Sequence, residues 1–403
     1  MNDAWKIKPL GKIITLQRGF DLPTQSRSDG EIAVIGSNGI VGFHGLAPKN
    51  VPIPGLMLGR SGSVGEITIW NEPYWPLNTV LYVKDFHGND PLFLSYWLRL
   101  FPFKQYAEGV SVPTLNRNSI NDVPFPLPEF DDQLKISMAL TAVEINIDFN
   151  SKALLTAREL KRAAMRELFT RGLRGEAQKG TEIGLVPESW DVVPLGLLGR
   201  VGNGSTPKKS IPEYWNGGTY PWLTSAKVYD REIIQADKFV TDVALRECHL
   251  PRVEPGAILI AITGQGKTLG HCAVLRMQAT INQHIAYVAT DTSRADPSFV
   301  RGYLETQYDY LRQVGSGGGS TKGALTCAFL RGLPIPFPLL NEQREIVEVL
   351  DAIDRKIDLH QRKRTVLEDL FKALLHKLMT GEIRVADLDL SALGNSPMEG
   401  VAA

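Results

Sequence analysis

One segment of the chain has the residue types of a phosphate-binding loop. It follows an apolar run, reads Ala261-Ile262-Thr263-Gly264-Gln265-Gly266-Lys267-Thr268, and fits the loose P-loop pattern. In a working P-loop, the lysine and backbone N–H groups at the start of a helix hold nucleotide phosphates. Residues 269–275, however, have the pattern of a strand, and the related stretch at 57–69 has no Gly-Lys-Thr. A turn between strands explains both stretches, so a P-loop nucleotide-binding enzyme is only the alternative hypothesis.

Other patterns typical of catalysis or metal binding are weaker. Asn71-Glu72-Pro73-Tyr74 differs from the Asn-Pro-Pro-Tyr loop of adenine methyltransferases at Glu72, and we interpret it as a surface turn. The pairs Cys248-His249 and His271-Cys272 lack the two-residue gaps of zinc sites, so ordinary packing is the better interpretation. We therefore predict no catalytic residue, no metal site and no cofactor in this chain.

The composition indicates a multidomain globular protein. The 403 residues suffice for two or more cores, and 44 Lys and Arg residues balance 44 Asp and Glu residues. Zero net charge argues against an indiscriminate nucleic-acid clamp but allows local basic surfaces. The three cysteines cannot form a disulfide framework, and the start of the chain does not resemble a signal peptide. The longest apolar run, 257–262, is too short to span a bilayer, so we expect a cytoplasmic protein without membrane contact.

The chain repeats itself. Residues 109–170 match residues 319–380 without a gap at an offset of 210, and residues 5–11 match 190–196 at an offset of 185. Since the offset grows, the second copy carries about 25 more residues. Each copy is thus a variable globular half followed by a more uniform helical half.

The globular halves have the pattern of mixed α/β domains. Apolar and β-branched runs interrupted by Gly, Pro and Asn turns predict strands. They lie at 31–35, 66–69, 80–83, 257–262, 273–275 and 284–288. Short helices are predicted at 91–100 and 297–310.

Each helical half begins after alternating prolines, at 124–128 and 334–338, which hold the chain extended. Apolar residues then recur in alternating three- and four-residue steps, the pattern of a coiled-coil seam, although Lys161 interrupts it. The predicted seam residues are Ile136, Leu140, Ile147, Ile346, Leu350, Ile353, Ile357, Leu367 and Leu374. Gly172 and Gly381 stand where helices commonly stop. We expect the two long helices to pack as an antiparallel coiled coil rather than as two separate surface helices.

Asn150 and His360 occupy equivalent positions in the middle of this seam. A polar seam residue can fix the register of a coiled coil at some cost in stability, or be merely tolerated at a loosely packed point. The sequence leaves both interpretations open.

Order, spacing and duplication together resemble the specificity subunit of type I restriction–modification systems. The match lies in Pro126-Leu127-Pro128 before Asp132-Gln133 and in Pro336-Phe337-Pro338 before Glu342-Gln343, which resemble the family's proline-rich helix junction. Asp132 departs from the usual glutamate. The turn at 59–65 and the Ile281-Asn282-Gln283 segment are similar to parts of the family's target-recognition domains.

The resemblance implies a non-catalytic DNA reader and fixes the predicted domain boundaries. Target-recognition domains at 1–127 and 181–337 would each read one half of a bipartite site on double-stranded DNA. Spacer helices at 128–180 and 338–384 would set the gap and dock two methyltransferase subunits, and a tail would follow at 385–403. Partner subunits would carry S-adenosylmethionine, and restriction subunits would use ATP and Mg²⁺. A coiled-coil scaffold without sequence specificity is the second alternative.

Polar turns in both globular halves provide candidate DNA contacts. Base edges in the major groove require donors and acceptors, whereas lysines suit phosphates. The candidates are Asn38, Arg60, Ser61, Ser63, Lys208, Lys209, Ser225, Lys227, Gln265 and Lys267. For any single one of these residues an ordinary solvated turn is the simpler interpretation; the prediction concerns the set.

Overall fold

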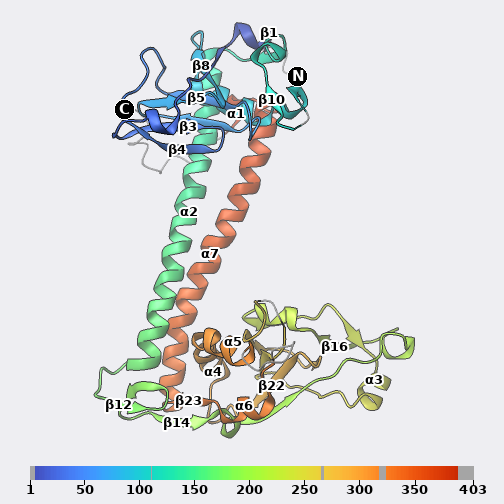
Figure 1. Ribbon diagram of the computed structural model, residues 1–403. Coiled ribbons are helices and arrows are strands. Elements are labelled where there is room, and N and C mark those ends of the chain that lie inside the picture. The colour runs from blue at the N-terminus through green and yellow to red at the C-terminus, as the bar shows by residue number, and fades with distance from the viewer. Residues whose placement is uncertain (1–4, 110, 265–266, 317–323, 389–403) are drawn as a thin grey trace. The chain divides into compact units, whose positions relative to one another are not determined.

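The computed structural model describes residues 5–109, 111–264, 267–316 and 324–388. The chain forms two compact units (Figure 1). Unit 1 contains Met1–Lys152 and His360–Ala403, and unit 2 contains Ala153–Leu359. Each unit therefore holds one globular half together with part of each long helix, α2 (Phe130–Arg171) and α7 (Leu340–Met379).

Unit 1 is built on a four-stranded antiparallel sheet of order β2-β8-β5-β6 and a three-stranded sheet of order β4-β3-β7. Their strands are β2 (Thr15–Arg18), β3 (Ile32–Gly36), β4 (Gly39–His44), β5 (Gly55–Gly59), β6 (Ile67–Trp70), β7 (Tyr74–Pro76) and β8 (Val80–Asp85). Two short pairs complete the unit, β1 (Lys6–Pro9) with β11 (Pro124–Leu127) and β9 (Ala107–Glu108) with β10 (Thr114–Leu115). Helix α1 (Pro91–Leu100) carries the buried side chains of Phe93 and Leu94 into the core.

Unit 2 repeats this topology with additions. The order β15-β22-β19-β20-β17 extends the four-stranded sheet by one strand, and β18-β16-β21 matches the three-stranded sheet. The strands are β12 (Gln178–Thr181), β13 (Gly184–Pro187), β14 (Asp191–Pro194), β15 (Gly199–Asn203), β16 (Tyr220–Leu223), β17 (Glu232–Ile233), β18 (Phe239–Val240), β19 (Ile258–Ala261), β20 (Cys272–Leu275), β21 (Thr280–Ile281), β22 (Ile285–Thr290) and β23 (Pro334–Phe337). The helices are α3 (Asp242–Glu247), α4 (Pro297–Thr306), α5 (Tyr308–Ser316) and α6 (Cys327–Gly332). The pair β14–β23 corresponds to β1–β11, so the duplication read from the sequence is confirmed in the topology.

A buried glutamine joins each globular half to its long helix in the same way. Gln133 Oε1 accepts from the backbone N–H of Asp90 at 2.9 Å, and Gln343 Oε1 accepts from that of Asp296 at 2.8 Å. Asp90 and Asp296 are the N-caps of α1 and α4. Each glutamine also donates to the carbonyl of a junction proline, Pro128 or Pro338. The repeated Gln therefore positions the short helix on the long one.

The two long helices end at the glycines that the sequence singled out. α2 ends at Arg171 and α7 at Met379, because Gly172 and Gly381 adopt φ values of 63° and 68° that terminate helices. The spacer segments given as 128–180 and 338–384 extend past these helix ends. Within 172–180 the chain instead enters strand β12. The single helix predicted at 297–310 is divided at Gln307 into α4 and α5.

Each unit buries part of both long helices in one core. In unit 1 Ile136 and Leu140 share a core with Leu375 and Leu378, and in unit 2 Leu168 and Phe169 share one with Ile346 and Leu350. Of the predicted seam residues, Ile136, Leu140, Ile346 and Leu350 are buried, and Ile147, Ile353, Ile357, Leu367 and Leu374 are half-buried. Within the described ranges, no helix has the length and apolar character needed to cross a membrane.

Candidate DNA interface

The turn after the central strand of each sheet is held by the same backbone contacts in both units. In unit 1 the N–H of Arg60 donates to Thr79 O at 2.8 Å, and Arg60 O accepts from the N–H of Leu115 at 2.8 Å. In unit 2 Ile262 takes the place of Arg60, with the N–H donating to His284 O at 3.0 Å and the carbonyl accepting from Leu325 at 2.8 Å. The two units thus bring corresponding loops together at the same end of the sheet.

In unit 1 these loops surround a polar hollow of about 720 Å³. Three arginines line it: Arg18, Arg60 and Arg117. Arg60 Nη1 donates to Asn78 O at 3.3 Å and Arg117 Nη1 to Leu16 O at 3.2 Å, so these two guanidinium groups are anchored by backbone. Arg18 Nη2 instead pairs with Asp21 Oδ1 at 3.1 Å. A guanidinium carries five N–H donors in a planar fork, which suits bidentate contact with a guanine edge or a phosphate.

The predicted contacts of the first half gather next to this hollow. The Ser63 hydroxyl donates to the side chain of Asn38, and Ser61 forms a backbone bridge with Thr114, which lines the hollow. A Cβ on Gly59 would lie 1.9 Å from Ser63 O, so only glycine permits this tight turn. The structure therefore brings Asn38, Arg60, Ser61 and Ser63 together. Arg18 and Arg117 were missed, because neither lies in a turn with a recognisable motif.

In unit 2 a chain of polar side chains links three loops. Thr206 donates to Gln283, the Gln283 amide contacts His284 Nε2 at 3.0 Å, and His284 Nδ1 is hydrogen-bonded to Thr263. The loop begins at Gly204, where a Cβ would lie 1.8 Å from Ile281 O. Lys208 and Lys209 follow on the same loop with exposed side chains, a position suited to phosphate contact.

The remaining predicted residues of the second half lie in different settings. Lys227, in the 3₁₀ turn that begins at Ser225, has its ammonium 3.0 Å from Asp237, so its charge is already offset. Lys267 is exposed, and its carbonyl accepts a hydrogen bond from Tyr308. Gln265 lies outside the described residues.

The strands on either side of the Gly-Lys-Thr motif, β19 and β20, pair antiparallel. Among the described residues between them, 262–264 and 267–271, no helix begins, whereas a P-loop requires a helix after the loop. The segment after Asn71 leads into β7, where Tyr74 is buried. Within the part of the chain that the structure describes, no three His, Cys, Asp or Glu side chains are grouped as metal ligands.

The fold is a duplicated α/β unit with polar loops at one end of each sheet, which defines a class of two-domain proteins. Residues 2–157 and 187–369 match the family model described as the type I restriction modification DNA specificity domain, so the chain belongs to this family and is a type I restriction–modification DNA specificity subunit.

Individual relatives and solved structures agree with this assignment. The chain is 24% identical over 341 residues to the specificity subunit of the type I restriction enzyme MjaVIII of Methanocaldococcus jannaschii, covering 83% of this chain and 80% of the relative. It is 31% identical over 214 residues to the MjaIX specificity subunit of the same organism, covering 51% and 48%. The crystal structure of the type I restriction–modification S subunit from M. genitalium matches with a TM-score of 0.64 at 15% identity, over 94% of this chain and 97% of the other, which shows the same fold.

Proposed function

We propose that this chain is a non-catalytic specificity subunit in which each globular half reads one half of a bipartite DNA site. The observation that carries the proposal is the equivalent loop scaffold of the two units, held by matching backbone hydrogen bonds at Arg60 and Ile262. The loops it presents differ: arginines surround the hollow of unit 1, and a Thr–Gln–His chain with two lysines lies in unit 2. The same scaffold with different side chains is what two different half-sites require.

The long helices act in this proposal as an antiparallel coiled coil that sets the gap between half-sites. Helices of 42 and 40 residues are each about 60 Å long at 1.5 Å per residue, which exceeds the roughly 34 Å of one DNA turn. Two readers on such a spacer can contact separate major-groove segments and skip the base pairs between them.

The chemistry belongs to partner subunits in this proposal. Two methyltransferase subunits that bind S-adenosylmethionine dock on the spacer, and restriction subunits supply the ATP- and Mg²⁺-dependent steps. The antiparallel pairing of β19 with β20 around the Gly-Lys-Thr motif, in place of a strand followed by a helix, is consistent with this division of labour. We expect the complex to work in the cytoplasm.

The candidate residues take different roles. In this proposal Arg60, with Ser61, Ser63 and Asn38, contacts bases, whereas Lys208 and Lys209 contact phosphates. Ser225, Lys227, Gln265 and Lys267 are further candidates in unit 2. Base contacts change which sequence is recognised, and phosphate contacts change affinity for all sequences.

Mapping of methylated adenines tests the proposal. The chain is co-expressed with its methyltransferase subunit in a host that lacks adenine methylation, and the modified positions are sequenced. We expect one interrupted, asymmetric sequence.

Two sets of variants separate base contacts from phosphate contacts. Arg60→Ala should relax or abolish recognition at the first half-site alone. Lys208→Ala with Lys209→Ala should reduce binding to all DNA and lower the slope of log affinity against log salt concentration by about 0.9 per lost contact. Lys152→Ala, which removes an exposed lysine of α2, is the control. Methylation of a short uninterrupted sequence would contradict the proposal.

A further inference from the structure

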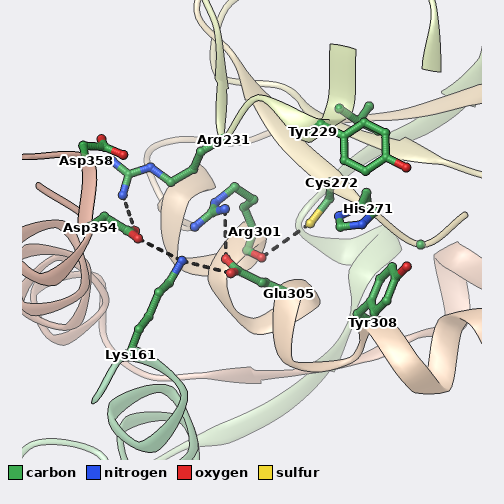
Figure 2. Close-up of a pocket in the computed structure, with 12 residues that line it drawn as sticks. Lys161, Tyr229, Arg231, His271, Cys272, Arg301, Glu305, Tyr308, Asp354 and Asp358 are labelled. Carbon is green, nitrogen blue, oxygen red and sulfur yellow. Dashed lines mark hydrogen bonds and ion pairs between the residues drawn. The ribbon is translucent and has the colours of Figure 1, made fainter. Parts of the chain in front are cut away.

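In unit 2 a charged pocket of about 460 Å³ lies where the globular half packs against the long helices (Figure 2). Side chains from four parts of the chain meet there. Lys161 comes from α2, Glu305 from α4, Asp354 from α7 and Arg231 from the segment before β17. We call the surface formed by Lys161 and Asp354 the second seat, because α4 of the second globular half packs on it.

Lys161 is the centre of this network. Its Nζ lies 2.9 Å from Glu305 Oε1 and 3.0 Å from Asp354 Oδ1, as the dashed lines in Figure 2 show. The side chains of Lys161 and Asp354 are only 14% and 11% exposed. Arg231 pairs with the same aspartate, and Arg301 Nη1 lies 3.0 Å from Glu305 Oε2. The Lys161 ammonium thus joins the globular half to both helices, with Lys161 and Asp354 mostly buried and Glu305 partly exposed at 37%.

The first globular half rests on its helices through a different set of charges. Arg99 Nη1 of α1 lies 2.7 Å from Glu144 Oε1 of α2, and the Tyr96 hydroxyl donates to Glu144 Oε2 at 2.6 Å. The ring of Tyr96 packs edge-on against Phe371 of α7, with centroids 6.1 Å apart. We call the surface formed by Glu144 and Phe371 the first seat.

The repeat makes the two seats directly comparable. At the offset of 210, Glu144 corresponds to Asp354 and Phe371 corresponds to Lys161. The N-caps Asp90 and Asp296 are 206 apart, and the same offset places Arg99 opposite Glu305. Both seats therefore contain a carboxylate, Glu144 in the first and Asp354 in the second. The helix that packs on the seat carries the cation Arg99 in unit 1 but the anion Glu305 in unit 2. Lys161 lies between the two carboxylates of unit 2 and offsets their charge.

We propose that Lys161 is a positioning residue that fixes the second recognition domain on its spacer helices and makes this seat specific for that domain. If α4 docked on the first seat, the carboxylate of Glu305 would lie beside that of Glu144. Phe371, which takes the place of Lys161 there, has no charge to offset them. Buried ion pairs contribute little net stability but strongly disfavour mispaired arrangements, because an unpaired buried charge is costly. The network therefore fixes the orientation from which the second half-site is read, and hence the gap that the subunit accepts.

The test uses the assembled methyltransferase and rests on the proposed function. The value of kcat/KM for methylation is measured on duplexes that carry the mapped half-sites at the native gap and at gaps one base pair shorter and longer. Lys161→Met keeps the length of the side chain and removes its charge. We expect the discrimination between native and altered gaps to fall about tenfold. Lys161→Arg should retain the discrimination, and Lys152→Met, on the exposed face of the same helix, should not change it.

Two further measurements separate positioning from general stability. Glu305→Gln leaves the pair of Lys161 with Asp354 in place and should lower the discrimination by a smaller factor, which keeps the test decisive if Lys161→Met fails to assemble. In the Lys161→Met complex we also expect faster alkylation of Cys272, which lines the same pocket and is buried. Unchanged gap discrimination in the assembled Lys161→Met complex, or in Glu305→Gln if that complex alone assembles, would overturn the inference. A wild-type complex that methylates no interrupted sequence would instead overturn the proposed function.

Discussion

His360 Nδ1 donates a hydrogen bond to Asn150 Oδ1 at 3.0 Å, although the two residues occupy the same place in the two copies of the repeat. The contact therefore joins equivalent positions of the two long helices, and both residues belong to unit 1. The Asn150 amide also donates to Asn146 O at 2.8 Å, so its N–H group has a partner in the same helix and its oxygen has a partner in the other helix. Of the two interpretations that the sequence left open, the contact favours a register-fixing pair.

This pair predicts strong coupling between two substitutions. Asn150→Leu alone should lower the free energy of unfolding by about 1–2 kcal/mol, because the His360 ring loses its acceptor at a half-buried position. The double variant with His360→Leu should recover most of the loss, since two apolar side chains can pack there. A double-mutant cycle by chemical denaturation measures the coupling. Additive losses would show that the two side chains do not act together.

A second prediction concerns the departure from the family pattern at Asp132. Its counterpart Glu342 is buried, and Glu342 Oε2 accepts from Trp190 Nε1 at 3.2 Å. In the first copy Asp132 and Trp5 instead line a hollow of about 180 Å³. A side chain one methylene longer should reach the Trp5 indole, so Asp132→Glu is expected to stabilise the protein by about 1 kcal/mol. The measurement is the denaturation midpoint, and Asp131→Glu at the exposed neighbouring position is the control. A lower midpoint for Asp132→Glu would show that the hollow cannot accept the longer chain.

Much of the fold could be predicted from local signals. Strands β11 and β23 each begin with a proline and contain a second one, and Gly172 ends α2, because these residue types restrict or permit backbone conformations whatever surrounds them. The role of Lys161 could not be predicted in this way. It interrupts the apolar seam, and its partners Glu305 and Asp354 are distant in the sequence, so only the folded chain brings the charges together. One signal for this site is visible in the sequence, namely that the equivalent positions of the repeat both hold an acidic residue, Glu144 and Asp354.

The same limit applies to the candidate interface. Arg60 and the Lys208–Lys209 loop were found because turns rich in polar residues are visible in a sequence. Arg18 lies at the end of strand β2 and Arg117 in a short 3₁₀ turn, and they reach the same hollow as Arg60 only because the β-sheet and the β10 bridge bring those segments together. Conversely, Lys227 has the residue type of a phosphate contact, but its ion pair with Asp237 depends on the tertiary structure.

Cysteine reactivity provides a third prediction. Burial raises the pKa of the Cys272 thiol to about 12, whereas Cys248 and Cys327 are half-exposed. Because the thiolate is the reactive form, iodoacetamide at pH 8 should label Cys248 and Cys327 while leaving Cys272 unmodified until the protein unfolds. The same raised pKa makes the free energy of unfolding depend on pH. Below the ordinary thiol pKa of 9.0 the thiol is protonated in both states, and as the pH rises from 9.0 towards 12 the unfolded chain ionises first, so the folded state loses stability. Mass spectrometry of peptides after timed labelling measures the order. Early labelling of Cys272 would mean that the pocket beside Lys161 opens in solution.

The last prediction tests the spacer directly. Insertion of one helical turn of four residues after Ile147, with a matching turn after Ile357, should lengthen both helices by about 6 Å. DNA rises about 3.4 Å per base pair, so the gap between the recognised half-sites should grow by about two base pairs while each half-site keeps its sequence. An insertion in one helix alone is the matched control, because helices of unequal length cannot keep both ends of the pair in register, so it should weaken the helix pair without defining a new gap. Adenine methylation mapping measures the gap. An unchanged gap in the doubly lengthened protein would show that the helices do not determine the spacing between the half-sites.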